Sequence, residues 1–174
     1  IGNAECKEQL STLSDSGRMP HALLIEGPAG SGRRTMARIV AQAAVCRHPD
    51  RAVRPCGGCP DCIKAKAGTH PDISFFGGSE RARSFGIQTV RELREEGYRR
   101  PNEAECRVFV LVNAQALSLE GQNALLRIIE EPPKHLRFIF TCQSRFQLLE
   151  TIRSRTALIC ARRASDSSLR RAPI

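Results

Sequence analysis

The stretch HALLIEGPAGSGRRTMARIVAQAAVC, residues 21–46, decides how the rest of the chain is interpreted. Its residues 22–25 form a short apolar run that stops at Gly27-Pro28, which predicts a buried strand. A glycine-rich turn follows, and residues 36–46 then have the composition of a helix. A strand, a glycine-rich turn and a helix in this order are typical of a phosphate-binding loop in an α/β protein.

Apolar runs and amphipathic segments alternate along the remainder of the chain. Strands are predicted at residues 72–76, 107–112, 136–141 and 156–161. Helices are predicted at residues 2–16, 63–68, 86–100, 118–131 and 146–155, with Ser118 as the N-cap of the fourth. Residues 46–62 are too rich in Cys, Pro and Gly for regular structure. Because strands alternate with helices, we expect a three-layer α/β domain with a mostly parallel sheet.

Composition limits the class of protein. With 174 residues and 41% hydrophobic content, the chain can bury one good core. The net charge of +9 suits a polyanionic partner such as DNA or nucleotide phosphate, and equally a solvated basic surface. One Tyr and no Trp argue against a row of stacking platforms for single-stranded nucleic acid. No apolar run approaches the ~18 residues of a membrane span and no secretory signal is present, so we expect a cytoplasmic protein without membrane contact.

The glycine-rich turn departs from a working phosphate loop. Such a loop needs a Lys that reaches the phosphates, followed by a Ser or Thr that holds magnesium. Arg33 replaces that Lys and Arg34 replaces the hydroxyl residue, while Thr35 comes one position late, about 100° further round the helix. We therefore predict a degenerate loop rather than a plain glycine turn. Its candidate residues are Gly27, Gly30, Gly32, Arg33, Arg34 and Thr35.

The second element of an ATPase site is a buried strand that ends in acidic residues, one to hold magnesium and one to activate water. The candidate strand RVFVLV runs directly into Asn113-Ala114-Gln115. Val112 cannot hold a metal and Asn113 cannot accept a proton, so the catalytic half of the site is missing as well.

Four of the eight cysteines are clustered in the sequence. Cys46, Cys56, Cys59 and Cys62 include two CxxC steps that share Cys59. A Gly57-Gly58 turn separates Cys56 from Cys59. Four thiolates suit tetrahedral Zn²⁺ without an open position, which predicts a structural zinc site. Four unrelated thiols are the alternative. With four cysteines present, His48 and His70 are not needed as ligands. Ordinary buried roles are expected for Cys6, Cys106, Cys142 and Cys160.

Three motifs in this order carry a resemblance to a known family: PHALLIEGPAGSG from Pro20, NALLRIIEEPP from Asn123 and TIRSR from Thr151. From residue 2 to about 161, the sequence resembles the clamp-loader ATPase family of bacterial DNA polymerase III, which includes gamma, tau and delta prime subunits. The resemblance implies a RecA-like P-loop domain of the AAA+ class, with a zinc module inserted after the loop helix. The gamma type keeps a Lys-Thr loop and an Asp-Glu pair that this sequence lacks, as delta prime subunits typically do.

The resemblance also points to one arginine. Ser154-Arg155-Thr156 falls where the family has Ser-Arg-Cys, whose Arg acts in trans as an arginine finger on ATP bound by the neighbouring subunit. Arg155 is therefore the candidate catalytic residue, although Thr156 departs from the family pattern. A surface ion pair is the alternative role for Arg155, and a shift of the alignment would point to Arg153 instead.

The resemblance implies a domain organisation and a set of partners. Residues 1–164 are expected to form the AAA+ RecA-like domain, with the zinc module at about 46–62, and residues 165–174 a tail or the start of a missing lid domain. The expected role is that of a delta prime type subunit, a component of the DNA polymerase holoenzyme without ATPase activity of its own. Its partners would be gamma/tau and delta subunits and, through the assembled complex, the sliding clamp and primed DNA.

Two alternatives stay open. One is an active gamma/tau-type ATPase in which Arg33 serves as the phosphate-binding cation and Thr35 reaches the metal by a shift of the loop. The lid domain that the family ordinarily carries is not part of this sequence, which weakens the case for tight ATP binding. The other is a zinc-dependent DNA-binding module that uses the basic residues near the cysteines, namely Arg47, Arg51, Arg54, Lys64 and Lys66.

Overall fold

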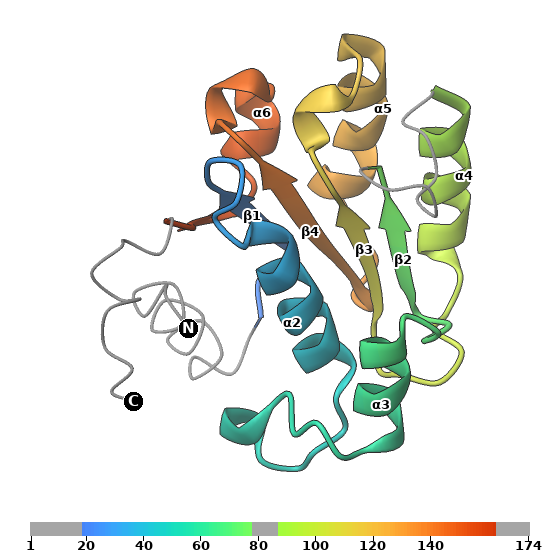
Figure 1. Ribbon diagram of the computed structural model, residues 1–174. Coiled ribbons are helices and arrows are strands. Elements are labelled where there is room, and N and C mark those ends of the chain that lie inside the picture. The colour runs from blue at the N-terminus through green and yellow to red at the C-terminus, as the bar shows by residue number, and fades with distance from the viewer. Residues whose placement is uncertain (1–18, 78–86, 163–174) are drawn as a thin grey trace, which may run out of the picture.

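The computed structural model of the chain describes residues 19–77 and 87–162 (Figure 1). One sheet of five parallel strands has the order β2-β3-β4-β1-β5. The strands are β1 Ala22–Glu26, β2 Ile73–Phe76, β3 Arg107–Leu111, β4 Leu136–Cys142 and β5 Ala157–Cys160. This confirms the predicted α/β class with a mostly parallel sheet.

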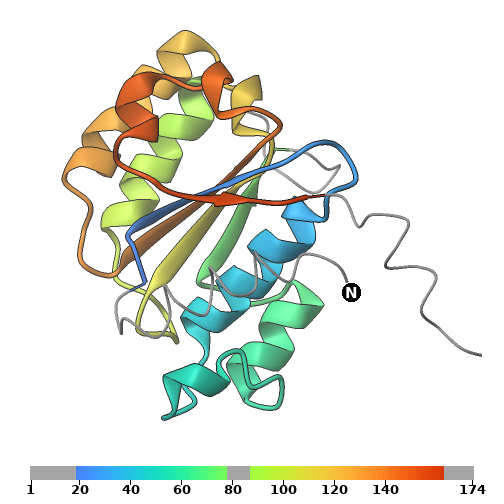
Figure 2. The ribbon, with the colours of Figure 1, turned by 90° about the vertical axis from the view of Figure 1, so that its left-hand side faces the viewer.

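Helices cover both faces of the sheet, which gives three layers (Figure 2). The α-helices are α2 Arg33–Val45, α3 Pro60–Ala67, α4 Ile87–Tyr98, α5 Leu119–Glu130 and α6 Glu150–Arg153. Short 3-10 turns are η1 Arg51–Val53, η2 Ala114–Ala116 and η3 Arg145–Gln147. On one face α2 packs on the strands with α3 beside it, and α4, α5 and α6 lie on the other face. No helix in the two described ranges has both the length and the hydropathy to cross a bilayer.

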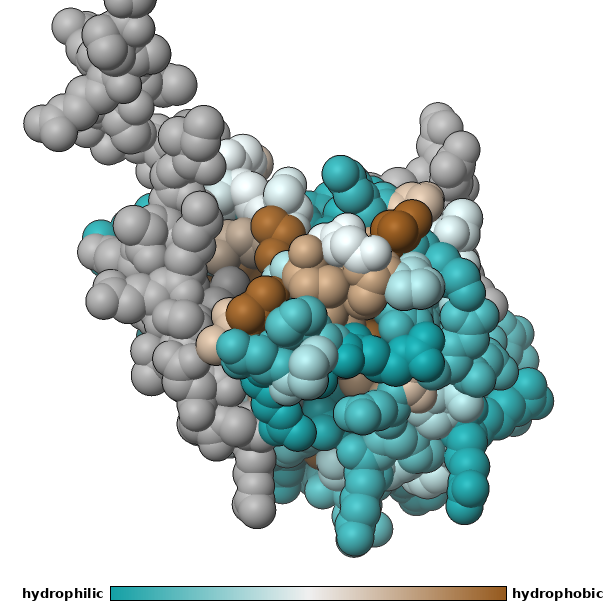
Figure 3. All heavy atoms as spheres, turned by 90° about the horizontal axis from the view of Figure 1, so that it is seen from below, coloured by the Kyte–Doolittle hydropathy of each residue, from teal (hydrophilic) through white to brown (hydrophobic). Residues whose placement is uncertain are grey.

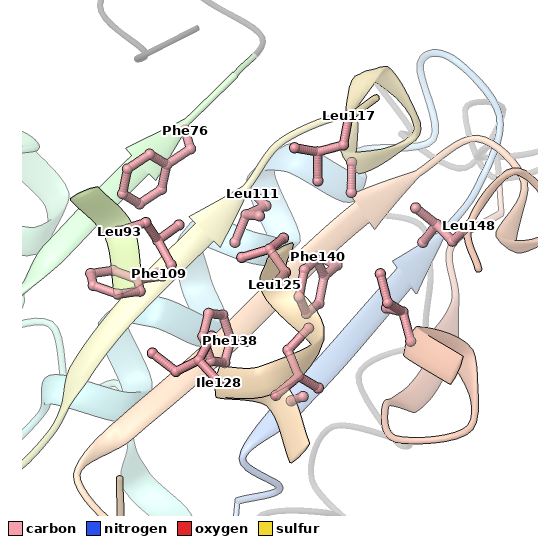
Figure 4. Close-up of a cluster of buried hydrophobic side chains, with 14 of the residues drawn as sticks. Phe76, Leu93, Phe109, Leu111, Leu117, Leu125, Ile128, Phe138, Phe140 and Leu148 are labelled. Carbon is pink, nitrogen blue, oxygen red and sulfur yellow. The ribbon is translucent and has the colours of Figure 1, made fainter. Parts of the chain in front are cut away.

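The central strands β1, β3 and β4 are mainly apolar because both of their faces are buried. In β1, Ala22 and Leu24 join the cluster under α4 and α5, while Leu23 and Ile25 join the cluster under α2. All residues of β3 are buried in the same two-sided way. The α4–α5 side is built around aromatic rings and leucines (Figure 4). Unbroken apolar runs are the expected sequence pattern of such a parallel sheet.

Two helices begin three residues earlier than predicted. The loop helix α2 begins at Arg33 instead of residue 36, because Gly32 in the left-handed region ends the turn directly before it. Helix α3 begins at Pro60 instead of residue 63, so residues 46–62 are not wholly irregular. Pro60 suits the first helical position, and Cys59 caps the helix by accepting the N–H of Cys62.

The predicted helix at 146–155 is divided into η3 and α6. Leu148 between them is extended and buried, so its contact with the core interrupts the helical path. Ser118 caps α5 as predicted, because its hydroxyl accepts the N–H of Gly121 at 3.1 Å. The predicted helix at residues 2–16, Cys6 within it, and the tail at 165–174 lie outside the described residues.

Candidate functional site

The glycine-rich loop joins the carboxyl end of β1 to α2, as a phosphate loop does. Gly27 cannot be replaced there without movement, because an added Cβ would lie 2.5 Å from the carbonyl oxygen of Ala161. Gly30 and Gly32 have φ values of 79° and 80°, a conformation that other residues adopt only with strain. The loop therefore combines left-handed glycines with a position at the carboxyl edge of the sheet, where α/β proteins bind ligands.

Arg33 is folded back onto this loop. Its Nη1 donates to the carbonyl oxygens of Gly27 at 2.9 Å and Pro28 at 2.7 Å. Its Nη2 donates to Oδ1 of Asn113, 2.9 Å away at the end of β3. The three hydrogen bonds hold the guanidinium against protein acceptors, whereas a phosphate-binding lysine must present its charge to the ligand. Arg33 therefore connects the loop to the end of β3 by hydrogen bonds.

Thr35 and Asn113 are two further positions at which the sequence departs from a working phosphate loop and strand end. Thr35 is exposed while the next residue, Met36, is buried against the sheet, as the predicted rotation around the helix requires. Asn113 has a φ of 56° and donates its backbone N–H to Oγ1 of Thr141 at 3.0 Å. Thr141 was missed from the sequence. The signal was available, since Thr141 is the polar residue that directly follows the apolar run 138–140 of β4.

The four predicted cysteine ligands are brought together at the opposite end of the molecule. Their Sγ atoms all lie within 4.8 Å of one another. The Sγ of Cys46 lies 3.6 Å from that of Cys56 and 3.9 Å from that of Cys59, and Cys56 and Cys62 are 4.0 Å apart. Zinc–sulfur bonds of about 2.3 Å in a tetrahedron place sulfurs about 3.8 Å apart. Disulfide bonding needs about 2.05 Å. The four thiols therefore fit a tetrahedral metal ion.

A buried polar network lies beside the cysteine cluster. Asp61, between two of the ligands, receives Nε of Arg47 at 2.6 Å and Nη2 of the same residue at 3.0 Å. Nε2 of His70 lies 3.4 Å from Oδ1 of Asp61, the oxygen that also accepts Nη2 of Arg47, and Nδ1 of His70 accepts the backbone N–H of Asp72 at 3.1 Å. The guanidinium of Arg47 holds the pKa of Asp61 below its usual range. These contacts join the cysteine segment to the start of β2, and His70 serves as a link in the network.

Two of the four thiols have strongly shifted pKa values. Backbone N–H groups of Cys59 and Gly58 lower the pKa of Cys56 to about 6. Burial raises the pKa of Cys62 to about 12. A bound divalent cation stabilises thiolates, so metal binding would remove the proton of Cys62 near neutral pH. Metal affinity should therefore decrease as the pH falls.

Arg155 lies on the surface, two residues after the end of α6. Its Nη2 is 3.1 Å from Oε1 of Glu130 at the end of α5, and its Nη1 donates to the carbonyl oxygen of Thr151 at 3.1 Å. The Arg155 and Glu130 side chains are 39% and 42% exposed, so the pair contributes about 0–1 kcal/mol to stability. The guanidinium is partly accessible, and a competing anion would replace the weak pair with Glu130.

Arg153, the alternative from a shifted alignment, points elsewhere. Its Cζ lies 5.3 Å from the ring centroid of Phe146, over the ring face. Both Glu130 and this stacked Phe146 were missed from the sequence, because neither contact follows from local spacing. The two arginines of the motif are therefore engaged by different parts of the molecule.

Comparison with known proteins places this geometry in a family. A family model described as "DNA polymerase III, delta subunit" matches residues 2–164. The chain belongs to the clamp-loader family of DNA polymerase III. The family membership expected from the three sequence motifs is thereby confirmed.

Relatives within the clamp-loader family include more than one subunit type. The chain is 37% identical over 156 residues to the DNA polymerase III subunit gamma/tau of Mycobacterium tuberculosis (strain ATCC 25618 / H37Rv), covering 90% of this chain and 27% of the relative. It is 31% identical over 151 residues to the subunit delta' of Escherichia coli (strain K12), covering 87% of this chain and 45% of the relative. The chain thus spans less than half the length of these relatives.

Solved structures agree on the fold of this clamp-loader family member. A gamma subunit-related protein from Thermotoga maritima matches with a TM-score of 0.67 and 16% identity, covering 92% of this chain and 47% of that one. The RuvB Holliday junction branch migration motor of Thermotoga maritima matches with a TM-score of 0.54 and 16% identity, covering 93% of this chain and 45% of that one. These likenesses support the RecA-like P-loop architecture.

Proposed function

We propose that the chain is a clamp-loader subunit of the delta prime type, which hydrolyses no ATP itself and helps gamma/tau and delta subunits to load the sliding clamp onto primed DNA. The observation that carries the proposal is the 2.9 Å hydrogen bond between Arg33 and Asn113. It joins the two positions where an ATPase needs a phosphate-binding lysine and an acid.

The chemistry at these positions supports binding without turnover. The Arg33 guanidinium is held by three protein acceptors, so its charge is directed away from an incoming polyphosphate. Asn113 can neither hold magnesium through a carboxylate nor remove a proton from water. The loop glycines still offer a backbone cradle, which can bind a phosphate or sulfate weakly.

An active gamma/tau-type ATPase is the competing function, and overall identity favours it, at 37% against 31% for the delta prime relative. Overall identity mostly reports a shared core, whereas hydrolysis depends on a few side chains. Arg33, Thr35 and Asn113 are those side chains here, and their contacts and positions favour the inactive type.

We expect the purified chain to show no ATP hydrolysis above background in the presence of magnesium. Titration with a fluorescent ATP analogue should give at most weak binding, and phosphate release should not depend on the chain. A gamma/tau relative assayed in parallel is the positive control. Turnover that is abolished by Arg33→Ala would establish the active alternative, because the same guanidinium would then have to serve the phosphates.

The Arg33 contacts should contribute measurably to stability. Arg33→Ala removes three hydrogen bonds from a charged donor, and we expect it to lower the free energy of unfolding by roughly 1–3 kcal/mol, measured by urea denaturation. Arg33→Lys keeps the charge but lacks the planar fork that reaches three acceptors. Its loss of unfolding free energy should therefore be intermediate. The exposed Arg91 on α4 gives the matched control, Arg91→Ala. Equal stability of both alanine variants would contradict a stabilising role of the Arg33 hydrogen bonds between the loop and the end of β3.

We further propose that Cys46, Cys56, Cys59 and Cys62 hold one structural Zn²⁺ in a module at about residues 46–62. The sulfur geometry supports it, and the closed set of four thiolates leaves no position for a substrate. The module forms the lower end of the molecule, where hydrophilic atoms surround a smaller apolar area (Figure 3).

The alternative of a zinc-dependent DNA-binding module is less well supported. Arg47 is bound to Asp61, Lys64 forms an ion pair with Glu103, and Arg54 donates to the carbonyl oxygen of His48. Three of the basic residues near the cysteines are therefore occupied within the protein. A phosphate backbone would have to displace these contacts to gain the usual electrostatic attraction.

In the proposed assembly, residues 1–164 act as the AAA+ domain, and Arg155 acts in trans on ATP held by a neighbouring subunit. The exposure of Arg155 and the weakness of its pair with Glu130 support that role. A finger of this kind stabilises charge on the transferring phosphoryl group from across the interface.

A further inference from the structure

Phe146 is an exposed aromatic residue held between two arginines. At 72%, it is the most exposed large hydrophobic residue in the described ranges 19–77 and 87–162. The Cζ atoms of Arg145 and Arg153 lie 5.1 and 5.3 Å from its ring centroid. The ring belongs to η3, directly after the carboxyl end of β4, on the edge of the sheet that also carries the glycine-rich loop.

The turn that presents this ring is firmly attached to the core. The backbone N–H of Arg145 donates to Oε1 of Glu26 at 2.8 Å, at the end of β1. Leu148, two residues after the ring, is only 4% exposed and packs in the α4–α5 cluster. The backbone N–H of Leu149 donates to Oε1 of Gln122 at 2.9 Å. Phe146 therefore projects from a fixed turn, and its exposure is not that of a loose loop tip.

An exposed ring of this kind is suited to an interface. Burial of a phenylalanine side chain is favourable, and this exposed ring has yet to gain most of that free energy. Aromatic and arginine side chains are enriched among the residues that dominate protein–protein affinity. The two guanidiniums keep the ring in one orientation, which reduces the entropy lost on binding.

Charge and position indicate the partner. Residues 144–156 contain three arginines and one acidic residue, Glu150, so the segment is complementary to an acidic surface. Arg153, which packs on the ring, is two residues from Arg155 in the same short segment. Phe146 and Arg155 thus belong to one short segment, with the Phe146 turn attached near the start of α5 and Arg155 paired at its end, so a single partner surface can extend over both. A single ring without a second platform is a poor site for successive bases of single-stranded DNA.

We propose that Phe146, flanked by Arg145 and Arg153, is the anchor by which this chain docks onto the ATP-binding clamp-loader subunit that Arg155 serves. The partner surface is an apolar pocket with acidic residues at its rim, beside the bound nucleotide. This inference rests on the proposed function. Phe146 is a docking residue and takes no part in the chemistry, so its loss weakens assembly without changing the reaction at an assembled site.

The test compares assembly with ATPase activity in the full-length subunit. Phe146→Ala should weaken association with a gamma/tau-type subunit by about tenfold or more, and Phe146→Glu should weaken it further. The dissociation constant is measured by analytical ultracentrifugation or surface plasmon resonance. At saturating subunit concentration, the ATPase rate of the assembled ring should equal that of the wild type. Tyr98→Ala removes a 58% exposed aromatic residue from the end of α4 and should leave assembly unchanged.

The outcomes separate this inference from the finger role. Wild-type affinity of both Phe146 variants would overturn the docking site, and so would an unchanged protein affinity with reduced binding of single-stranded DNA. Weaker assembly of the Phe146 variants, together with unaltered ATPase in Arg155→Ala, would retain the docking site and remove the finger. Circular dichroism and thermal unfolding should match the wild type, because the ring contributes little to the core.

Discussion

Arg155→Ala in the full-length subunit should leave folding and ring assembly intact and reduce ATP hydrolysis at one site of the assembled clamp loader by about a thousandfold. The guanidinium stabilises charge that develops on a phosphoryl group bound by another subunit, so the loss is confined to the site facing this chain. The total DNA- and clamp-stimulated rate falls less, because other sites keep their own arginines. Steady-state ATPase of the reconstituted ring, with single-turnover measurements to resolve the sites, gives the result.

Two further variants separate the finger from local effects. Glu130→Ala removes the resting partner of Arg155 and should leave ATPase at the wild-type rate, whereas a role confined to their ion pair would make both variants equivalent. Arg153→Ala tests the register of the motif and should be nearly silent when the subunit is saturating. Unchanged ATPase and clamp loading in the Arg155 variant, with the ring fully assembled, would reduce Arg155 to a surface residue.

The spacing of residues along the sequence predicted those features whose contacts are formed by residues close together in the chain. The two CxxC steps place three sulfurs close together through a tight turn, and the helix after the loop brings Cys46 to the same point. The unbroken run of β3 required burial on both faces, which the sheet provides. In each case, the relevant contacts are a direct consequence of backbone geometry and hydrophobic pattern.

Contacts between distant segments could not be predicted in this way. The sequence indicates that Arg33 replaces a lysine, but the direction of its side chain depends on Asn113, which lies 80 residues away. Similarly, residues 146–155 have helical composition, yet the burial of Leu148 interrupts the helix and leaves Phe146 exposed. Tertiary packing overrides local propensity at such positions.

The cysteine cluster and the glycine-rich loop lie at opposite ends of α2 (Figure 1). The helix has 13 residues, which corresponds to a length of roughly 20 Å at 1.5 Å per residue. No contact in the described residues links a cysteine ligand to the loop directly. Changes to the metal site should therefore leave the loop, Arg155 and Phe146 in place, and the metal can be tested separately from the ATPase function.

Cys59→Ser should remove the metal while the main fold survives. We expect about one zinc per chain in the wild type, purified without added metal, and close to none in the variant, by elemental analysis. Serine suits this substitution because it is a preferred N-cap residue and can still accept the N–H of Cys62 at the start of α3. The helix cap is thus retained while the thiolate is lost, which isolates the metal-binding role of Cys59.

The size of the effect follows from the energetics of structural zinc. Apparent binding free energies of about 10–16 kcal/mol are typical of zinc-finger peptides at neutral pH, so loss of one ligand should release the ion and disorder the module. Hydrogen exchange should increase at residues around η1 and α3 and stay low in the sheet. Cys160, which was expected to be buried, is exposed at the end of β5, where no strand in the described part of the chain covers it from the other side, and the Cys160→Ser variant should keep its zinc. A well-folded wild-type protein without bound metal would contradict the site, because the module would then fold without the ion that is proposed to stabilise it.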